Sequence, residues 1–367
     1  FFFAAMDPIQ YLQTHKVPQL LDDLVADLLQ SQPADVAAHI AAYATQLQLG
    51  LSASGQPHLH TFLDQRVPDA ALRDVFLALA QSCRDISTAV GNVVDGAAQH
   101  TTTNTFGDEQ LKVDLLSDRM IFDRLKACSA VAAAASEETP ELQHLCPDGK
   151  FTVTFDPLDG SSIIGTNFTV GSIFGIWPGS NIIGLRAGDQ VGCAAALYGP
   201  RTTLMLGLQD GVHEFTLTCG HWVLTREALK VAPKAKVFAP GNLRATQELP
   251  WYRTLMDRWM ERRLTLRYTG GMVPDVLQFL IKGNGIYTTP ECPSAKVKLR
   301  VAFECAPLAW LVEKAGGSSS DGYQRYLDLK LRTLDQRSPV ALGSAQEVQE
   351  YESLCSGRGP SDGGERR

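Results

Sequence analysis

The first fifty residues carry apolar positions at helical spacing. A leucine stripe with steps of three or four residues follows Pro18, a residue that suits the first turn of a helix. The members of the stripe are Leu20, Leu21, Leu24, Leu28 and Leu29. Pro33 interrupts it, and Asp35 then stands in the first turn of a second amphipathic helix. The apolar face of that helix comprises Val36, Ile40, Tyr43 and Leu47. The pattern predicts a small all-α helical hairpin module over residues 7–49.

The rest of the chain mixes helical and strand periodicities. A polar stretch with Gly, Ser and Pro predicts a linker over 50–66, and apolar steps of three and four after Pro68-Asp69 predict a long amphipathic helix. Further on, VGSIFGIW, VGCAAALYG, TTLMLGL and HEFTL are typical of strands, whereas DVLQFLIK and PLAWLVEKAG are helical. The alternation predicts a layered α/β domain over 67–356. Residues 357–367 are rich in Gly, Ser and charge, and we expect them to be disordered.

Composition narrows the class of protein and its partners. The chain has 367 residues, 44% of them hydrophobic, and a formal net charge of -7. We expect a soluble protein that binds neither nucleic acid nor membrane, because its basic residues do not cluster and no apolar run could span a bilayer. The eight cysteines are scattered without a metal-binding spacing, which favours reduced thiols and a cytoplasmic location. A glycosome-like organelle and a plastid remain alternatives.

The stretch KFTVTFDPLDGSS is the most informative part of the sequence. Apolar residues alternate with threonines from Phe151 to Phe155, which predicts a strand. Pro157 cannot donate a ladder hydrogen bond, so we expect the strand to stop before it and a turn to follow. Such a turn would direct Asp156, Asp159 and a backbone carbonyl at one point, and hard divalent cations prefer these oxygen ligands.

The residues after this turn suit an anion. Gly160 lets the backbone approach a ligand closely, and Ser161 and Ser162 add amide and hydroxyl donors of the kind that hold phosphate. The alternative interpretation is an Asp-rich turn that caps the next helix or strand.

Further carboxylates are candidates for the same pocket, several of them where apolar segments end. They are Asp108, Asp114, Glu137, Glu138 and Glu304. Since open α/β sheets place sites beyond strand ends, we expect these acids near Asp156 and Asp159. Crowded carboxylates repel one another unless cations neutralise them, and two or three Mg²⁺ ions would do so, with Mn²⁺ as an alternative. Asp118, Asp123 and Glu141 are interpreted as helix caps or solvated residues.

These motifs resemble, in order, the metal-site pattern of the fructose-1,6-bisphosphatase family, from about Val67 to Leu354. The resemblance implies a layered α-β-α-β-α fold, with a metal-site half over 67–235 and a sugar-binding half over 236–356. The metal ligands that it implies are Glu137, Asp156, Asp159 and Glu304, with the carbonyl of Leu158. The residues implied to position or deprotonate the attacking water are Asp108, Asp114 and Glu138. Those implied to hold the cleaved phosphate are Gly160, Ser161 and Ser162.

Several longer motifs resemble the sedoheptulose-1,7-bisphosphatase branch of that family, among them TNTFGDEQLKVDLLSD, GDQVGCAAALYGPRTT, FAPGNLRAT and LRYTGGMVPDV. The resemblance implies Mg²⁺-dependent hydrolysis of sedoheptulose 1,7-bisphosphate by a metal-activated water. Fructose 1,6-bisphosphate, alone or alongside the first, is the alternative substrate, because the two sugars differ by one carbon between their phosphates.

The family also binds a distal phosphate and the sugar itself. The matching positions here are Asn242, Arg267, Tyr268, Tyr287, Lys298 and Arg300. In the family the arginine of the LRYTGG motif reaches the site of a neighbouring subunit. The resemblance therefore implies a homodimer or homotetramer.

The N-terminal hairpin resembles a different family. VPQLLDDLVADLLQSQPADVAAHIAAYATQL is similar to the docking and dimerisation helices (RIIa/Dpy-30-like) of the type II regulatory subunit of cyclic-AMP-dependent protein kinase. The resemblance implies a four-helix dimer with a groove for the amphipathic helix of a partner. An ordinary helical hairpin that aids solubility or oligomerisation is the alternative.

Overall fold

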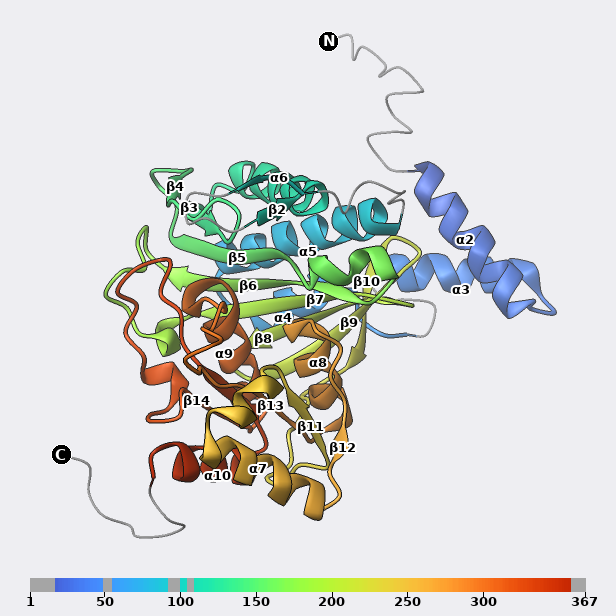
Figure 1. The fold of residues 1–367 in the computed structure, drawn as a ribbon. Coiled ribbons are helices and arrows are strands. Elements are labelled where there is room, and N and C mark those ends of the chain that lie inside the picture. The colour runs from blue at the N-terminus through green and yellow to red at the C-terminus, as the bar shows by residue number, and fades with distance from the viewer. Residues whose placement is uncertain (1–16, 49–54, 92–99, 104–108, 358–367) are drawn as a thin grey trace.

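The computed structural model describes residues 17–48, 55–91, 100–103 and 109–357. Its main body stacks helices and two sheets in the order helix, sheet, helix, sheet, helix (Figure 1). The successive helical layers are formed by α5 (Ala70–Gly91) with α6 (Lys112–Lys126), by α8 (Met272–Lys282) with α9 (Ala306–Lys314), and by α7 (Pro250–Glu261) with α10 (Ala345–Cys355). The predicted layered α-β-α-β-α fold is confirmed.

The larger sheet has the strand order β10-β9-β8-β7-β6-β5-β3-β4, in which β3 and β5 are parallel and the other neighbours antiparallel. Along the chain its strands are β3 (Val131–Ser136), β4 (Gln143–His144), β5 (Phe151–Asp159), β6 (Val170–Pro178), β7 (Gly192–Tyr198), β8 (Thr202–Leu208), β9 (Gly211–Thr218) and β10 (His221–Arg226). Helices cover both faces, so β5 is buried along its whole length. The four predicted strand-like runs form β6 to β9.

The smaller sheet has the order β12-β11-β13-β15-β14. Its strands are β11 (Val237–Pro240), β12 (Thr265–Leu266), β13 (Ile286–Thr289), β14 (Ser318–Ser320) and β15 (Val340–Gly343). Two further short strands, β1 (His100–Thr103) and β2 (Glu109–Leu111), pair with each other. Short 3-10 turns join several elements, namely η2 (Ala187–Asp189), η3 (Leu243–Gln247) and η5 (Tyr326–Asp328).

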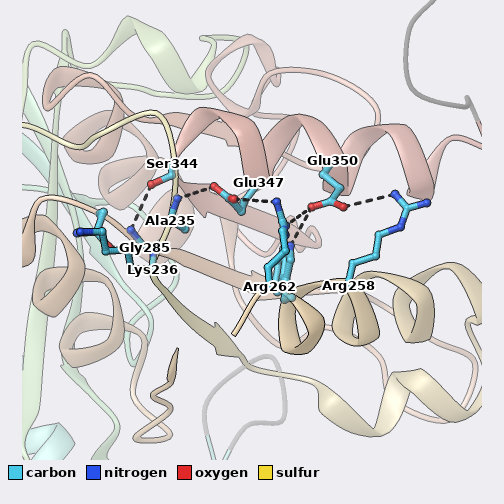
Figure 2. Close-up of polar contacts among 10 residues, drawn as sticks. Ala235, Lys236, Arg258, Arg262, Gly285, Ser344, Glu347 and Glu350 are labelled. Carbon is cyan, nitrogen blue, oxygen red and sulfur yellow. Dashed lines mark hydrogen bonds and ion pairs between the residues drawn. The ribbon is translucent and has the colours of Figure 1, made fainter. Parts of the chain in front are cut away.

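Polar contacts fasten the outer helices α7 and α10 to each other and to the smaller sheet (Figure 2). Arg262, directly after α7, donates to Glu350 of α10 at 2.6 Å. Glu347 of α10 is fully buried and accepts the N–H of Ala235 at 2.7 Å. A buried carboxylate needs such partners, so this layer is held by specific pairing as well as by apolar packing.

The predicted N-terminal helices are present as α2 (Val17–Ser31) and α3 (Val36–Gln48). They project from one side of the main body (Figure 1), where Asp23 and His221 of β10 lie 2.8 Å apart. Part of their apolar surface is exposed, namely Leu21, Val25, Leu29, Val36 and Ile40. These two helices therefore offer an apolar surface that the main body leaves uncovered.

The segment predicted as a linker contains a helix. α4 (Leu59–Arg66) buries Leu59, Phe62 and Leu63 in the same core cluster as α5. Steps of three and one residues place these side chains on one helical face, a pattern too short to stand out beside the polar residues before it. The linker prediction is therefore wrong from residue 59 to residue 66.

Candidate active site

The end of β5 differs from the predicted turn. The strand does not stop before Pro157 but continues to Asp159, and the register of its pairing with β6 shifts between Asp156 and Asp159. Such an irregularity, typical of β-bulges, tolerates a proline because the ladder is already interrupted there. Residues three positions apart point to opposite faces of a regular strand, so the shift allows the two carboxylates to converge.

Asp156, Asp159 and Glu304 form one carboxylate cluster. Each offers an oxygen, and these oxygens lie within 4.8 Å of one another. Glu304 comes from the π-helical turn η4 (Val301–Cys305), which leads into α9, and it accepts the N–H of Arg300 at 2.6 Å. Two segments far apart in the sequence thus supply a set of hard oxygen ligands.

Backbone N–H groups hold the two aspartates of this cluster. Asp156 accepts the N–H of Leu158 at 2.9 Å. Asp159 accepts the N–H groups of Met272 and Val273, at 3.1 and 2.7 Å, at the start of α8. The positive end of a helix dipole therefore faces Asp159, which stabilises its negative charge.

Glu137 lies beside the same cluster because β3 runs parallel to β5. Its N–H donates to the carbonyl of Phe155 at 3.0 Å, and its carboxylate pairs with the guanidinium of Arg300 at 2.7 Å. Arg300 is buried and also donates to Asp335 at 3.0 Å. The resemblance predicts Arg300 at the distal phosphate, whereas here its guanidinium neutralises carboxylates, as a buried charge requires.

Asp114 stands in the first turn of α6 and has one unused oxygen. Its Oδ2 accepts the N–H of Leu111 at 3.2 Å, whereas its buried Oδ1 has no hydrogen-bond partner among the described residues. Burial raises the pKa of Asp114 to about 7, and the hydrogen bond from the N–H of Leu111 opposes this shift. A buried acceptor with this pKa suits a group that takes a proton near neutrality. Its predicted companion Glu138 lies in the turn after β3, and Asp108 lies outside the described residues.

Electrostatics in the cluster favour a bound cation. Burial raises the pKa values of Asp156 and Glu304 well above their usual range, and the charge of Glu137 adds to the effect. Burial likewise raises the pKa of Asp159 to about 7, although Val273 and Met272 donate to it. Ionising these neighbouring groups together costs free energy, and a divalent cation among them removes that cost. The residues present therefore fit metal ions.

The predicted phosphate-binding residues follow the cluster directly. Gly160 has φ 81°, a left-handed conformation that glycine adopts readily, and a Cβ there would lie 3.3 Å from the Cα of Gly271. Ser161 begins the 3-10 turn η1 (Ser161–Thr166), and Ser162 is exposed. The chain thus passes from the carboxylates to a turn with accessible donors.

Two predicted sugar-binding residues lie near the carboxylate cluster. The hydroxyl of Tyr268 donates to the carbonyl of Gly241 at 3.2 Å, and Tyr287 is buried on β13. Burial raises the pKa of both phenols, and the negative charge of Asp159 contributes to each shift. The roles of both tyrosines in sugar binding stay predictions.

The remaining sugar-binding candidates are Asn242, Arg267 and Lys298. Asn242, directly before η3, donates its side-chain N–H to the carbonyl of Pro290, directly after β13, at 2.9 Å, so its side chain makes a structural contact between two segments. Arg267 and Lys298 are exposed. Exposed basic side chains can reach a ligand or a second subunit, so the binding roles of Arg267 and Lys298 stay predictions, and so does that of Asn242.

Two buried aspartates that were not predicted as site residues border the site. Asp118, interpreted from the sequence as a cap or solvated residue, is only 7% exposed and is bonded to the turn after β3. The step of four residues from Asp114 to Asp118, which places both on one face of α6, is the signal that could have revealed it. Asp275 is fully buried and accepts the N–H of Thr269 at 2.9 Å. No local pattern marks it.

Known families match most of the chain. The family described as "Fructose-1-6-bisphosphatase, N-terminal domain" matches residues 60–227, and its C-terminal counterpart matches residues 231–356. The carboxylate cluster draws on both matched regions, with Asp156 and Asp159 in the first and Glu304 in the second.

Individual relatives agree with these matches. A chloroplastic sedoheptulose-1,7-bisphosphatase of Triticum aestivum is 45% identical over 326 residues, covering 88% of this chain and 81% of the relative. A class 1 fructose-1,6-bisphosphatase of Syntrophotalea carbinolica is 37% identical over 308 residues, covering 82% and 93%. The crystal structure of a provisional sedoheptulose-1,7 bisphosphatase from Toxoplasma gondii superposes with a TM-score of 0.77 at 36% identity, covering 82% and 99%. The chain therefore belongs to the fructose-1,6-bisphosphatase family.

Proposed function

We propose that this protein is a phosphoric monoester hydrolase that converts sedoheptulose 1,7-bisphosphate to sedoheptulose 7-phosphate and phosphate. The observation that carries the proposal is the buried cluster of Asp156, Asp159 and Glu304, followed at once by the donors of residues 160–162. The wheat relative, which is named a sedoheptulose-1,7-bisphosphatase, supports the seven-carbon substrate.

The donor set suits hard divalent cations. The residues that would hold them are Glu137, Asp156, Asp159 and Glu304, with the carbonyl of Leu158. Two or three Mg²⁺ ions fit such all-oxygen ligands, and Mn²⁺ is the alternative. When bound, these ions polarise the phosphoryl group, ease ionisation of the attacking water and stabilise the leaving oxygen.

Carboxylates of this chain orient the attacking water. Asp114 presents its buried Oδ1, which has no hydrogen-bond partner among the described residues, and burial raises its pKa to about 7, so it can accept the proton that the water loses. Glu138 and Asp108 assist in holding the water. Amide and hydroxyl groups of Gly160, Ser161 and Ser162 hold the oxygens of the phosphoryl group that leaves the sugar.

The sugar and its distal phosphate occupy the side of the site formed by the second half of the chain. Tyr268, Tyr287, Lys298 and Asn242 are the residues that we assign to the sugar and its distal phosphate. Arg267, exposed just beyond β12, reaches the site of a neighbouring subunit. The protein then works as a homodimer or homotetramer. Arg300 contributes indirectly, by balancing the charge of Glu137.

Fructose 1,6-bisphosphate is the alternative or additional substrate, since the relative from Syntrophotalea carbinolica is named a fructose-1,6-bisphosphatase. The test measures phosphate release from both sugars with Mg²⁺, with Asp159→Asn as the blank. A higher kcat/KM for the seven-carbon sugar supports the proposal. Equal or reversed preference would assign the alternative, and no release from either sugar would refute both.

The hairpin α2–α3 is proposed as a dimerisation and docking module separate from the catalytic halves. Its exposed leucines and valines support this role, because an apolar surface of this kind is normally covered by a partner. We propose that a second copy of the hairpin covers it, and that the paired helices bind an amphipathic helix of another protein. The boundaries 7–49, 67–235 and 236–356 belong to the same proposal, with α4 added to the catalytic part.

A cytoplasmic location is proposed from the scattered, unpaired cysteines. A plastid remains the alternative, since the wheat relative is named chloroplastic. Within the described ranges, no helix is both long enough and apolar enough to cross a membrane.

A further inference from the structure

Asp118 lies one helical turn after Asp114 on α6. Both oxygens of its carboxylate accept hydrogen bonds from the loop of residues 136–139. Oδ1 accepts the hydroxyl of Ser136, and Oδ2 accepts the hydroxyl of Thr139 at 3.1 Å. The Ser136 hydroxyl in turn accepts the N–H of Thr139 at 2.8 Å. The carboxylate therefore binds both ends of the turn formed by residues 136–139.

This turn carries two residues of the proposed site, Glu137 and Glu138. It is closed by a bond from the N–H of Ser136 to the carbonyl of Thr139 at 3.0 Å. It is joined to β5 by the bond from the N–H of Glu137 to the carbonyl of Phe155, directly before Asp156. Any shift of the turn would thus move Glu137 relative to the carboxylate cluster.

A role for Asp118 as a helix cap does not fit its position. α6 begins at Lys112, and Asp114 already bonds the backbone at its start, whereas Asp118 stands two turns into the helix. Its side chain faces the end of β3, away from solvent. A carboxylate is costly to bury, so one placed here with both oxygens paired holds a specific geometry.

We infer that Asp118 is a positioning residue, which fixes the turn of residues 136–139 so that Glu137 and Glu138 face Asp156 and Asp159. The inference rests on the proposed metal-dependent function. Residues that orient metal ligands typically change metal affinity by about 10- to 100-fold when they are replaced. Replacement of Asp118 should therefore change the affinity for metal rather than the affinity for the sugar.

The test compares Asp118→Asn with the wild type in calorimetric titration by Mn²⁺ and in the Mg²⁺ dependence of phosphate release. The amide keeps the size of the side chain but loses one acceptor, so we expect the metal dissociation constant to rise about tenfold. The KM for the sugar at saturating Mg²⁺ should stay within about twofold. Asp123→Asn, an exposed position on the same helix, is the matched control and should bind metal as the wild type does.

Thr139→Val provides a second variant in case Asp118→Asn does not fold. It removes one hydrogen bond to the carboxylate of Asp118. The metal dissociation constant should therefore also rise, but by a smaller factor than in Asp118→Asn. A lower Tm with unchanged metal affinity in the folded variants would overturn the inference and leave Asp118 a purely structural residue. Absence of metal binding by the wild type would instead refute the proposed function.

Discussion

The carboxylate of Asp159 accepts the backbone N–H of Val273 at 2.7 Å. The bond joins the end of β5, where the carboxylate cluster stands, to the start of α8. Directly before α8 lies the turn that follows Arg267 and Tyr268, two of the predicted substrate residues. Asp159 therefore has two roles, as a member of the cluster and as the acceptor that anchors α8.

Replacement of Asp159 by asparagine separates these two roles. The amide keeps one acceptor oxygen for α8, so the fold should persist, but the cluster loses a negative charge. We expect kcat to fall at least about 100-fold because metal binding and charge balance are lost. The measurement is phosphate release with Mg²⁺, with circular dichroism to verify folding. Turnover close to that of the Asp123→Asn control would contradict a metal role for Asp159.

Metal-free protein should lose stability as the pH rises. Burial raises the pKa of Asp114 and Asp159 to about 7 in the folded state, from an ordinary value of 3.8. The folded state then holds these protons more tightly than the unfolded chain. The stabilisation is fully present below about pH 4 and is lost as the pH rises through 7.

In EDTA, the Tm should therefore fall by about 5 °C or more between pH 5 and pH 8. Excess Mg²⁺ should raise the Tm more at pH 8 than at pH 5, because ionised carboxylates bind the cation. The double variant Asp114→Asn/Asp159→Asn should flatten the pH dependence in EDTA. A metal-free Tm that is constant or rising over this range would show that these groups do not titrate as described.

The layered fold was predictable because the strand-like and helical runs are long and strongly patterned. β6 to β9, α8 and α9 each correspond to a run with a single clear period. α4 was missed because its buried face rests on three residues beside a polar stretch. Short segments gain their structure from tertiary packing, which the local pattern does not contain.

The candidate site was predictable in its residue types but not in its geometry. The acids of FDPLDGSS predict a cation site. The sequence does not show that the strand continues through Pro157, where its pairing with β6 shifts in register. Asp118 and Arg300 owe their placement to residues far away in the sequence, Ser136 and Glu137 respectively. Such pairings depend on how β3, β5 and η4 are arranged in space, and the local pattern of apolar residues does not reveal this arrangement.

Asp275 should affect substrate binding more than the chemical step. Its two oxygens accept the N–H of Thr269 at 2.9 and 3.2 Å, which holds the turn after Arg267 and Tyr268. Asp275→Asn loses part of this bonding, so we expect the KM for the sugar bisphosphate to rise about tenfold, while kcat falls less than threefold. Steady-state kinetics at saturating Mg²⁺ measure both. Asp257→Asn on α7 serves as a control, and an unchanged KM in Asp275→Asn would remove the turn from substrate recognition.

The exposed apolar surface of α2 should control assembly without affecting catalysis. Val25 and Leu29 are 52% and 71% exposed and lie one turn apart, so a second copy of the hairpin would bury both. Burial of each side chain contributes about 1.5 kcal/mol, and loss of one raises a dissociation constant about tenfold. Val25→Asp/Leu29→Asp should therefore lower the molar mass measured by light scattering on the full chain. The catalytic domains still pair through the surface of Arg267, so kcat per site is unchanged. Asp123→Asn, an exposed position on α6 of the main body, should leave assembly intact. An unchanged mass in the double variant would rule out this surface as a dimer contact and leave a partner helix as its remaining ligand.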